Sequence, residues 1–462
     1  MNKFYSTIEN TFSASYDFMS REIAVGGDAS RAVRVLWLDS LVSGTALSDT
    51  VLRPLTDPLR FSPRDSAETL TQKLTGGSAY PSTVNVRDSA SELVRDMLNG
   101  FCVILTDDAA VSMEVRSTDA RSVDAPKEEK VIKGSKDAFT EILKTNITLI
   151  RRKIRDTRLT VKLCEIGKSP QAAAVVYLEG LASPDTVSQT VRRLGRISSD
   201  CVLSSAVIEE RLSDRPRSPF PQIITTERAD KFCINLLEGR VGVIADGLPI
   251  GYLAPGTFSQ FFKVPEDAAN HFIIATVLTL LRYAATVITL ILPAFYVAVA
   301  LYHQEMLPAK LMQSVIEAKK SVPFPTPVEI IMMLIAFELI QEAGLRLPDP
   351  VGEIVSIIGA LIVGQAAVEA RIVSPVVVIV IAVSAIAGTV MPSQDLAAAL
   401  RLARFALVLF AIVGGMFGIA VGVVMLAYHL STVDVFGVPY MEPFVGRDGR
   451  HTLRALGRGR LR

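Results

Sequence analysis

Long apolar segments, all of them after residue 270, constrain the fold of this chain most strongly. The first covers residues 271–303, where Arg282 is the only fully charged side chain, and it is long enough to cross the roughly 30 Å hydrocarbon core of a bilayer. Further segments cover residues 356–368, 372–391 and 402–430. Segments of this kind predict a bundle of membrane-embedded helices.

The region before residue 270 has a different character. Apolar runs of strand length alternate there with helical patterns, as in RAVRVLWLD (31–39) followed by TALSDTVLRPL (45–55). This pattern predicts a soluble α/β region. Two unlike halves also explain why 462 residues combine 50% hydrophobic residues and a mean hydropathy of +0.37 with a charged fraction of 21%, close to the roughly 25% of soluble proteins.

We therefore expect two tandem α/β soluble subdomains followed by a polytopic transmembrane helix bundle. The expected boundaries are a first subdomain at 1–122, a linker with an amphipathic helix at 123–160, a second subdomain at 161–270, the bundle at 271–446 and a basic tail at 447–462.

An internal repeat supports the two subdomains. VLWLDSLVS, beginning at Val35, aligns without gaps on VVYLEGLAS, beginning at Val175, which is a displacement of 140 positions. A second match follows at a displacement of 139, from NGFCVILTDD (99–108) to EGRVGVIADG (238–247). Two matches in the same order at nearly one displacement favour a duplicated strand, turn and helix over chance similarity.

The segment between the copies is expected to contain a helix from Asp137 onward. Its apolar side would carry Phe139, Ile142, Leu143, Ile147 and Ile150. Residues 151–155 (RRKIR) make its end basic. Because no aromatic residues alternate with these charges, a solvated helix end or a subunit contact is favoured over nucleic-acid binding.

The ends of the chain set the expected topology. The N-terminus lacks the apolar core of a secretory signal, and the arginine-rich tail suits a cytoplasmic position beside anionic lipid, although a disordered polar tail explains it equally well. If both ends are cytoplasmic, the number of crossings is even. A further apolar helix at 328–344 carries three acids, each costing at least about 2.5 kcal/mol at the bilayer centre. We therefore predict four full spans, with this helix buried among them, at the interface or entering partway.

Acids in that helix are the first candidates for function. Glu338 and Glu342 lie one helical turn apart and share a face. They could attract cations along a pore, or they could pair with Arg346 and Arg282 to fix the bundle. Both interpretations stay open. Gln365 is polar within an apolar segment, which predicts a hydrogen bond inside the bundle.

Small residues recur at helical spacing in two of the apolar segments. Gly414, Gly418 and Gly422 are four positions apart, as are Ser356, Ala360 and Gly364. Such spacing allows helix backbones to approach closely, so these residues and Gly359 are expected to pack helices, which is favoured over a pore or hinge role.

No sequence signature of an enzyme is present. The chain lacks the motifs of phosphate loops, serine hydrolases and zinc proteases, and its four cysteines and four histidines are scattered. We therefore expect no catalysis, no metal and no cofactor. The spacing of the cysteines also argues against a disulfide framework.

Several segments together resemble one family, the A subunits of GerA-type spore germination nutrient receptors. They include SKDAFTEILKTNITLIRRKIRD (135–156), SPFPQIITTERADK (218–231), PAKLMQSVIEAKKSVPFPTPVE (308–329), FELIQEAGLRLPDPVG (337–352), GALIVGQAAVEARIVSP (359–375) and FGVPYMEPF (436–444). Glu338, Glu342, Arg346 and Gln365 lie inside these segments and are therefore the candidate pore or gating residues.

The resemblance implies a multi-pass protein of the spore inner membrane with its N-terminal domain on the cytoplasmic, spore-core side. It implies a homo-oligomer that acts with a transporter-like B subunit and a lipoprotein C subunit, and that forms a nutrient-gated cation channel. The alternative is an auxiliary or scaffold protein of the stage V sporulation AF type, which acts with germination or dipicolinate-release machinery. A secondary transporter is disfavoured because the repeat lies in the soluble half.

Overall fold

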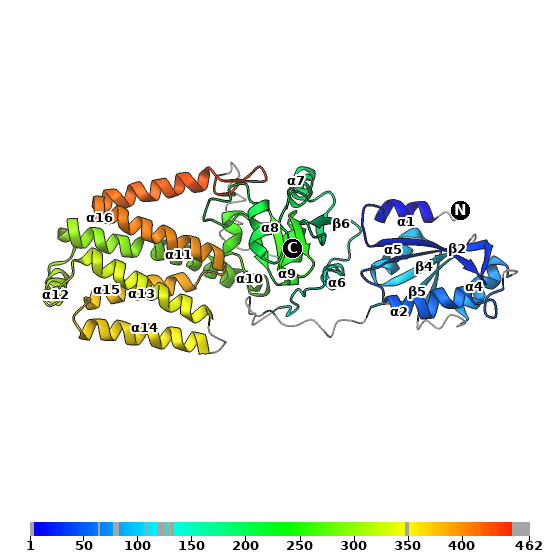
Figure 1. Ribbon diagram of the computed structural model, residues 1–462, viewed down its shortest axis with the longest axis horizontal. Coiled ribbons are helices and arrows are strands. Elements are labelled where there is room, and N and C mark those ends of the chain that lie inside the picture. Colours follow the sequence, from blue (N-terminus) through cyan, green and yellow to red (C-terminus); the bar gives the residue numbers. More distant parts are fainter. Residues whose placement is uncertain are drawn as a thin grey trace. The chain divides into compact units, whose positions relative to one another are not determined.

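The computed structural model describes residues 4–62, 65–76, 83–106, 109–117, 126, 129, 134–200, 202–346 and 351–445 (Figure 1). The side chains of residues 29–30, 268, 345–346 and 351–358 lie outside this description. The chain forms two compact units: an α/β unit of residues 1–216 and 222–255, and a helical unit of residues 217–221 and 256–462. The predicted basic tail at 447–462 lies outside the described residues.

The first half of the α/β unit contains a five-stranded antiparallel sheet in the order β1-β2-β4-β5-β3. Its strands are β1 (Phe18–Val25), β2 (Asp28–Leu38), β3 (Val84–Arg87), β4 (Phe101–Leu105) and β5 (Ala110–Glu114). Its helices are α1 (Tyr5–Phe12), α2 (Gly44–Leu47), the π-helical turn η1 (Ser48–Leu52), α3 (Arg53–Thr56), α4 (Ala67–Thr75) and α5 (Ala90–Leu98).

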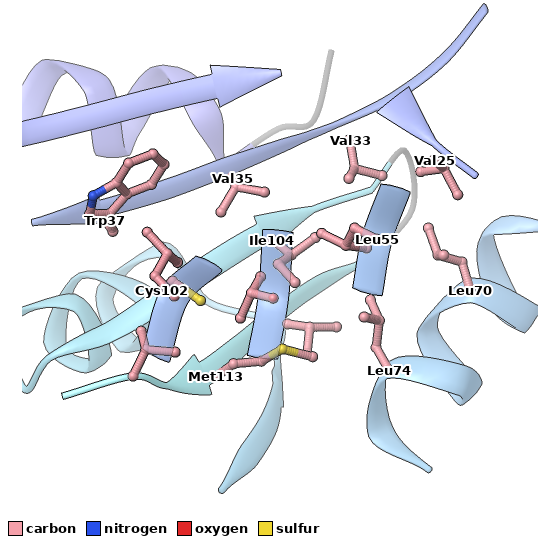
Figure 2. Close-up of a cluster of buried hydrophobic side chains, with 14 of the residues drawn as sticks. Val25, Val33, Val35, Trp37, Leu55, Leu70, Leu74, Cys102, Ile104 and Met113 are labelled. Carbon is pink, nitrogen blue, oxygen red and sulfur yellow. The ribbon is translucent and has the colours of Figure 1, made fainter. Parts of the chain in front are cut away.

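Both faces of this sheet are covered, which explains why β2 is apolar at successive positions. Val33, Val35 and Trp37 point toward one face, where they pack with α3, α4 and strand residues such as Cys102 and Met113 (Figure 2). Leu36 and Leu38 point toward the other face and pack with α1 and α5. The two clusters follow from the strand's alternation of side chains.

The second half repeats this architecture with the sheet order β6-β7-β9-β10-β8. Its strands are β6 (Leu159–Ile166), β7 (Gln171–Leu178), β8 (Ile224–Thr226), β9 (Val241–Ala245) and β10 (Gly251–Ala254), and its helices are α6 (Leu143–Lys153), α7 (Pro184–Leu194), α8 (Ser205–Leu212) and α9 (Ala229–Leu237). The aligned sequences fall on β2 and β7 and on β4 and β9. The duplication expected from the sequence is therefore present in the fold, and the two copies are called the first and second subdomains below.

The helix between the copies begins later than expected. The α6 helix starts at Leu143, whereas residues from Asp137 to Ile142 are not helical. Ala138 forms a bridge with Arg228, and Phe139 packs edge-on against Phe232 at 5.2 Å between ring centroids. These contacts with the second subdomain override the local helical pattern.

The helical unit contains α10 (Pro265–Ala269), α11 (Phe272–Tyr302), α12 (Ala309–Lys319), α13 (Thr326–Arg346), α14 (Val351–Glu369), α15 (Pro375–Thr389) and α16 (Gln394–Ser431), with the short helices η2 (Phe258–Phe262) and η3 (Gln304–Met306) and the hairpin β11 (Asp434–Val435) and β12 (Val438–Pro439) (Figure 1). An apolar cluster joins α11, α13, α15 and α16 through residues such as Ala298, Ile330, Ile381 and Leu407.

Residues 256–270, which the sequence assigned to the second subdomain, are packed in the helical unit. The reason is an aromatic cluster around η2. Phe262 stacks on Tyr283 of α11 at 4.2 Å between centroids, and Phe258 lies 6.1 Å from Tyr440. Phe258 N–H also donates to the Tyr440 carbonyl at 2.8 Å.

By length and composition, two helices in the described residues are long and apolar enough to cross a membrane, namely α11 and α16, with mean hydropathies of 2.2 and 2.6; α16 is interrupted at Gly415. The other two predicted spans correspond to α14 and α15. The 15 residues of α15 are fewer than the roughly 20 that a straight crossing needs. The prediction of four spans stays a prediction.

Candidate functional site

A cluster of charged side chains lies inside the helical unit, where α13, α15 and α16 meet. The Glu338 carboxylate of α13 contacts two arginines of α16: Arg401 Nε at 3.2 Å and Arg404 Nη2 at 3.6 Å. Arg404 Nη1 also donates to Ser384 Oγ of α15 at 3.4 Å, and Arg401 Nη1 donates to Gln341 Oε1 at 3.4 Å. Polar groups from three helices therefore converge at one place.

Burial differs sharply among these groups. The side chain of Arg404 is 4% exposed, against 25% for Arg401 and 33% for Glu338. Because a buried guanidinium without an anion is strongly unfavourable, Glu338 is the group that makes the position of Arg404 tolerable. The contacts are imperfect, since Glu338 Oε2 and both arginine Nε atoms lack a hydrogen bond among the described residues. The cluster therefore joins α13 and α16 through ionic contacts of imperfect hydrogen-bond geometry.

A second acid of α13 is completely buried. Glu329 lies in the first turn of the helix, and its Oε2 accepts a hydrogen bond from the Ser374 N–H at 2.8 Å. Ser374 is the N-cap of α15. The carboxylate therefore lies at the N-terminal ends of two helices, where the peptide dipoles favour negative charge.

Arg282 does not pair with the acids of α13, as one interpretation of the sequence expected. Its guanidinium instead binds Asp267 of α10 through two hydrogen bonds of 2.6 and 3.0 Å, and it donates to the Phe262 carbonyl at 3.0 Å. The physical reason is proximity: α10 directly precedes α11, so Asp267 reaches Arg282 within one short connection.

The remaining polar candidates lie elsewhere on the helices. Glu342 is exposed, one turn beyond Glu338, and the side chain of Arg346 lies outside the described residues. Gln365 is exposed, and its amide donates to Glu369 Oε1 at 2.9 Å within α14 rather than across the bundle as expected. The structure thus brings Glu338 into the charge cluster, and Gln365 bonds within its own helix.

The predicted packing glycines divide into two groups. A Cβ on Gly364 would lie 3.2 Å from Val378 of α15, which is tighter than most such contacts, so this glycine allows close approach between the helices. A Cβ on Gly359 would lie 3.7 Å from Ile340 of α13, an ordinary van der Waals contact. A Cβ on Gly414, in contrast, would meet no atom within 4 Å.

Gly418 and Gly422 take part in a sharper feature, because α16 breaks at Gly415. That residue has φ 56° and ψ −136°, which only glycine adopts readily. A Cβ on Gly422 would lie 2.7 Å from Leu407, although the two residues would be about 22 Å apart in a straight helix. The chain therefore doubles back, and Gly418 and Gly422 allow the two halves of α16 to touch (Figure 1).

Tyr302 stabilises the backbone at this break. A helix break leaves carbonyl oxygens without their usual donors. The Tyr302 hydroxyl, at the end of α11, donates to the Ile412 carbonyl at 2.7 Å. The single apolar segment predicted at 402–430 is thus two helical halves joined at a glycine and held by α11.

Sequence reasoning missed Arg401, Arg404 and Gly415. Arg404 gave a signal, because it is a charged residue inside an apolar segment, and such residues need a partner. The sequence signal for Gly415 was weaker. It directly follows Gly414, so it does not belong to the four-residue spacing of Gly414, Gly418 and Gly422.

Comparison with known proteins decides the family. The sequence matches the Bacillus/Clostridium GerA spore germination proteins over residues 6–461. The chain belongs to the GerA family.

Its relatives in this family are similar over most of their length. Spore germination protein KA of Bacillus subtilis is 36% identical over 93% of this chain and 79% of that protein. Spore germination protein GerLA of Bacillus cereus is 34% identical over 94% of this chain and 88% of that protein. The uncharacterized membrane protein YfkQ of Bacillus subtilis is 35% identical over 88% of this chain and 79% of that protein.

One solved structure is also similar, the N-terminal domain of the A subunit of the Bacillus megaterium spore germinant receptor GerK3. It is 25% identical, with a TM-score of 0.42, and the match covers 55% of this chain and 94% of that chain.

Proposed function

We propose that this GerA-family chain is the A subunit of a germinant receptor in the spore inner membrane. The match over residues 6–461 is the observation that carries the proposal, because it spans the α/β unit and the helical unit together. The two long apolar helices, α11 and α16, support a membrane location. In this proposal the protein assembles with copies of itself and with a transporter-like B subunit and a lipoprotein C subunit, and it has no enzymatic activity.

The proposed action is to open a path for cations when a partner subunit binds a nutrient. The contacts of Glu338 support a specific role for it within that action. The Glu338 carboxylate is paired with two arginines, so its charge is not available to attract cations along a pore. The same pairing is well suited to hold α13 against α16 in one state of the receptor. In our proposal the charge cluster holds these two helices together, while the exposed Glu342 and Gln365 are the candidates for contact with ions.

Deletion of the gene in its spore-forming host tests the proposal. Deletion spores should fail to release cations in response to one class of nutrient. They should still germinate with exogenous dipicolinate, which acts without the nutrient receptor. Complementation with the wild-type gene should restore the response. Normal responses to all nutrients in the deletion strain would refute the receptor role, and slow dipicolinate release with intact nutrient sensing would favour the auxiliary protein instead.

A separate measurement tests the cation path. Purified protein reconstituted in liposomes with its partner subunits should carry cations in an assay of potassium flux when the nutrient is added. Glu342→Ala should change the flux, whereas Leu59→Ala, at an exposed position of the α/β unit, should not. Expressed and folded protein that conducts nothing with its partners present would contradict the channel proposal.

A further inference from the structure

The two subdomains differ in how one corresponding surface is covered. In the first subdomain this surface consists of residues 39–41, after β2, and 98–100, at the end of α5, and we call it the first end face. The corresponding residues of the second subdomain are 179–181, after β7, and 237–239, at the end of α9, and we call them the second end face. The duplication makes a direct comparison possible.

The first end face is covered by α6, which belongs to the second subdomain. Lys144 Nζ bonds Asp39 at 2.6 Å, Thr148 Oγ1 donates to the Ser40 carbonyl, and Arg155, just beyond the helix, bonds Asn99 at 2.9 Å. The apolar residues of this surface, Leu41 and Leu98, are 4% and 8% exposed.

The second end face is exposed. Leu181 and Leu237, which correspond to Leu41 and Leu98, are 44% and 53% exposed, and the adjacent Ile234 is 39% exposed. Leu181 and Leu237 are large apolar side chains whose counterparts are buried in the other copy, and Ile234 lies beside Leu237 on α9. Together they indicate a surface that a partner covers.

We propose that the second end face binds α1 of a second copy of this chain. The helix α1 holds the place in the first subdomain that α6 holds in the second: α1 precedes β1 and packs on α5, and α6 precedes β6 and packs on α9. The contact between chains would thus repeat the contact within the chain. Such a head-to-tail contact generates a ring when its rotation closes. This inference rests on the self-assembly in the proposed function and names the surface that mediates it.

The charges of the two end faces differ. Within the chain, Asp17 immediately before β1 pairs with Arg151 of α6 at 2.7 Å. At the second end face the corresponding residue immediately before β6 is Arg158, which is 53% exposed, and the only charged residue of α1 is Glu9. Arg158 already pairs with Asp156 at 2.7 Å, and Glu179 keeps the acidic character of its counterpart Asp39. The apolar side chains, rather than the charges, therefore carry the expected contact.

Cross-linking of the full-length protein in native membranes tests the inference. One chain carries Asn10→Cys on the exposed side of α1, and a second, differently tagged chain carries Leu237→Cys. Both carry Cys164→Ser and Cys201→Ser. The remaining Cys102 and Cys233 are buried, and burial raises the pKa of each thiol to about 12, so both react slowly.

The expected result is a disulfide-linked dimer that carries both tags. Replacing Asn10→Cys by Leu59→Cys, which is 95% exposed beside the helices of the opposite sheet face, should abolish it. A further Leu181→Glu substitution should also remove the dimer, whereas Leu59→Glu should leave it intact.

Three results would overturn the inference: no dimer although both chains are folded and inserted, a dimer formed mainly between two Leu237→Cys chains, or a cross-link only to proteins of another size. The assay needs no nutrient. If the deletion strain loses its nutrient response but no cross-linked dimer forms, the proposed surface is rejected and the proposed function is kept. If the dimer forms but the deletion strain germinates normally, the proposed function is rejected and the surface is kept.

Discussion

At the residue scale, Asp17 and Arg151 form the most buried ion pair among the described residues of the α/β unit. The side chains are 3% and 0% exposed, and the guanidinium also binds Ser15 Oγ and the Leu159 carbonyl. Residues 151–155 had the pattern of a solvated helix end, and for Arg151 that interpretation is wrong: the residue crosses between the subdomains and is fully buried.

Removing Arg151 should therefore be costly. Arg151→Ala leaves the Asp17 carboxylate buried without its cation, which costs about 3–5 kcal/mol of unfolding free energy for pairs of this kind. Urea unfolding of the full-length protein in detergent, followed by the fluorescence of Trp37, the single tryptophan, measures the change. Arg53→Ala, which breaks the exposed pair with Asp49, is the control and should leave the midpoint unchanged. Equal effects of the two variants would contradict the prediction.

The same pair predicts a response to acid. Burial alone would raise the pKa of Asp17, but the charge of Arg151 and hydrogen bonds from Arg151, Ser40 and Ser15 outweigh it and lower the pKa. Because the folded-state pKa lies below the unfolded value of about 3.9, the stabilisation is complete above that pH and is lost as the pH falls through the folded-state value. Urea unfolding from pH 6 downward should show a smaller loss of stability below about pH 4 for Asp17→Asn than for wild type.

Glu338 and Glu342 provide a matched pair in the helical unit. Among the described residues, Glu338 is the one anion that contacts Arg404, so the loss of stability in Glu338→Gln should lie between the roughly 0–1 kcal/mol of surface pairs and the roughly 3–5 kcal/mol of fully buried ones. Glu342→Gln, one turn away and exposed, should cost less. Thermal unfolding in detergent measures both. A larger effect at Glu342 would show that the charge cluster does not hold the helices.

At the element scale, the break in α16 can be tested with two adjacent glycines. Gly415→Ala places a Cβ 2.9 Å from Tyr302 at a positive φ, which should cost about 1–3 kcal/mol. Gly414→Ala meets open space and should stabilise its helix by up to about 1 kcal/mol. Melting temperatures in detergent should therefore shift in opposite directions. A parallel shift would mean that α16 is continuous in the membrane.

The elements also show how far the sequence could predict the structure. The repeat was detectable because both copies keep the apolar pattern of β2 and β7, but the shared strand order depends on pairings between distant residues. The late start of α6 arises from Ala138 and Phe139 contacting the second subdomain, which local periodicity does not report. Likewise, Glu338 and Arg404 are far apart in sequence, so their contact appeared only in the folded chain.

At the scale of the whole molecule, the two subdomains should open as one cooperative body. Their junction includes the Asp17–Arg151 pair, the contacts of α6 with residues 39–41, and a hydrogen bond from the Tyr16 N–H to the Val161 carbonyl at 2.9 Å. Independent domains would be joined by a few exposed contacts. A junction that buries an ion pair instead makes the opening of either subdomain expose a charge in the other.

Hydrogen exchange of the full-length protein tests this cooperativity. In wild type, amides of β2 and β4 in the first subdomain and of β7 and β9 in the second should exchange through the same highest-energy opening. In Arg151→Ala the two groups should separate, because the junction loses its buried pair while both sheets keep their own cores. Mass spectrometry of peptides from each sheet resolves the groups. Different opening energies already in wild type would mean that the subdomains are independent, and that α6 is only a tether between them.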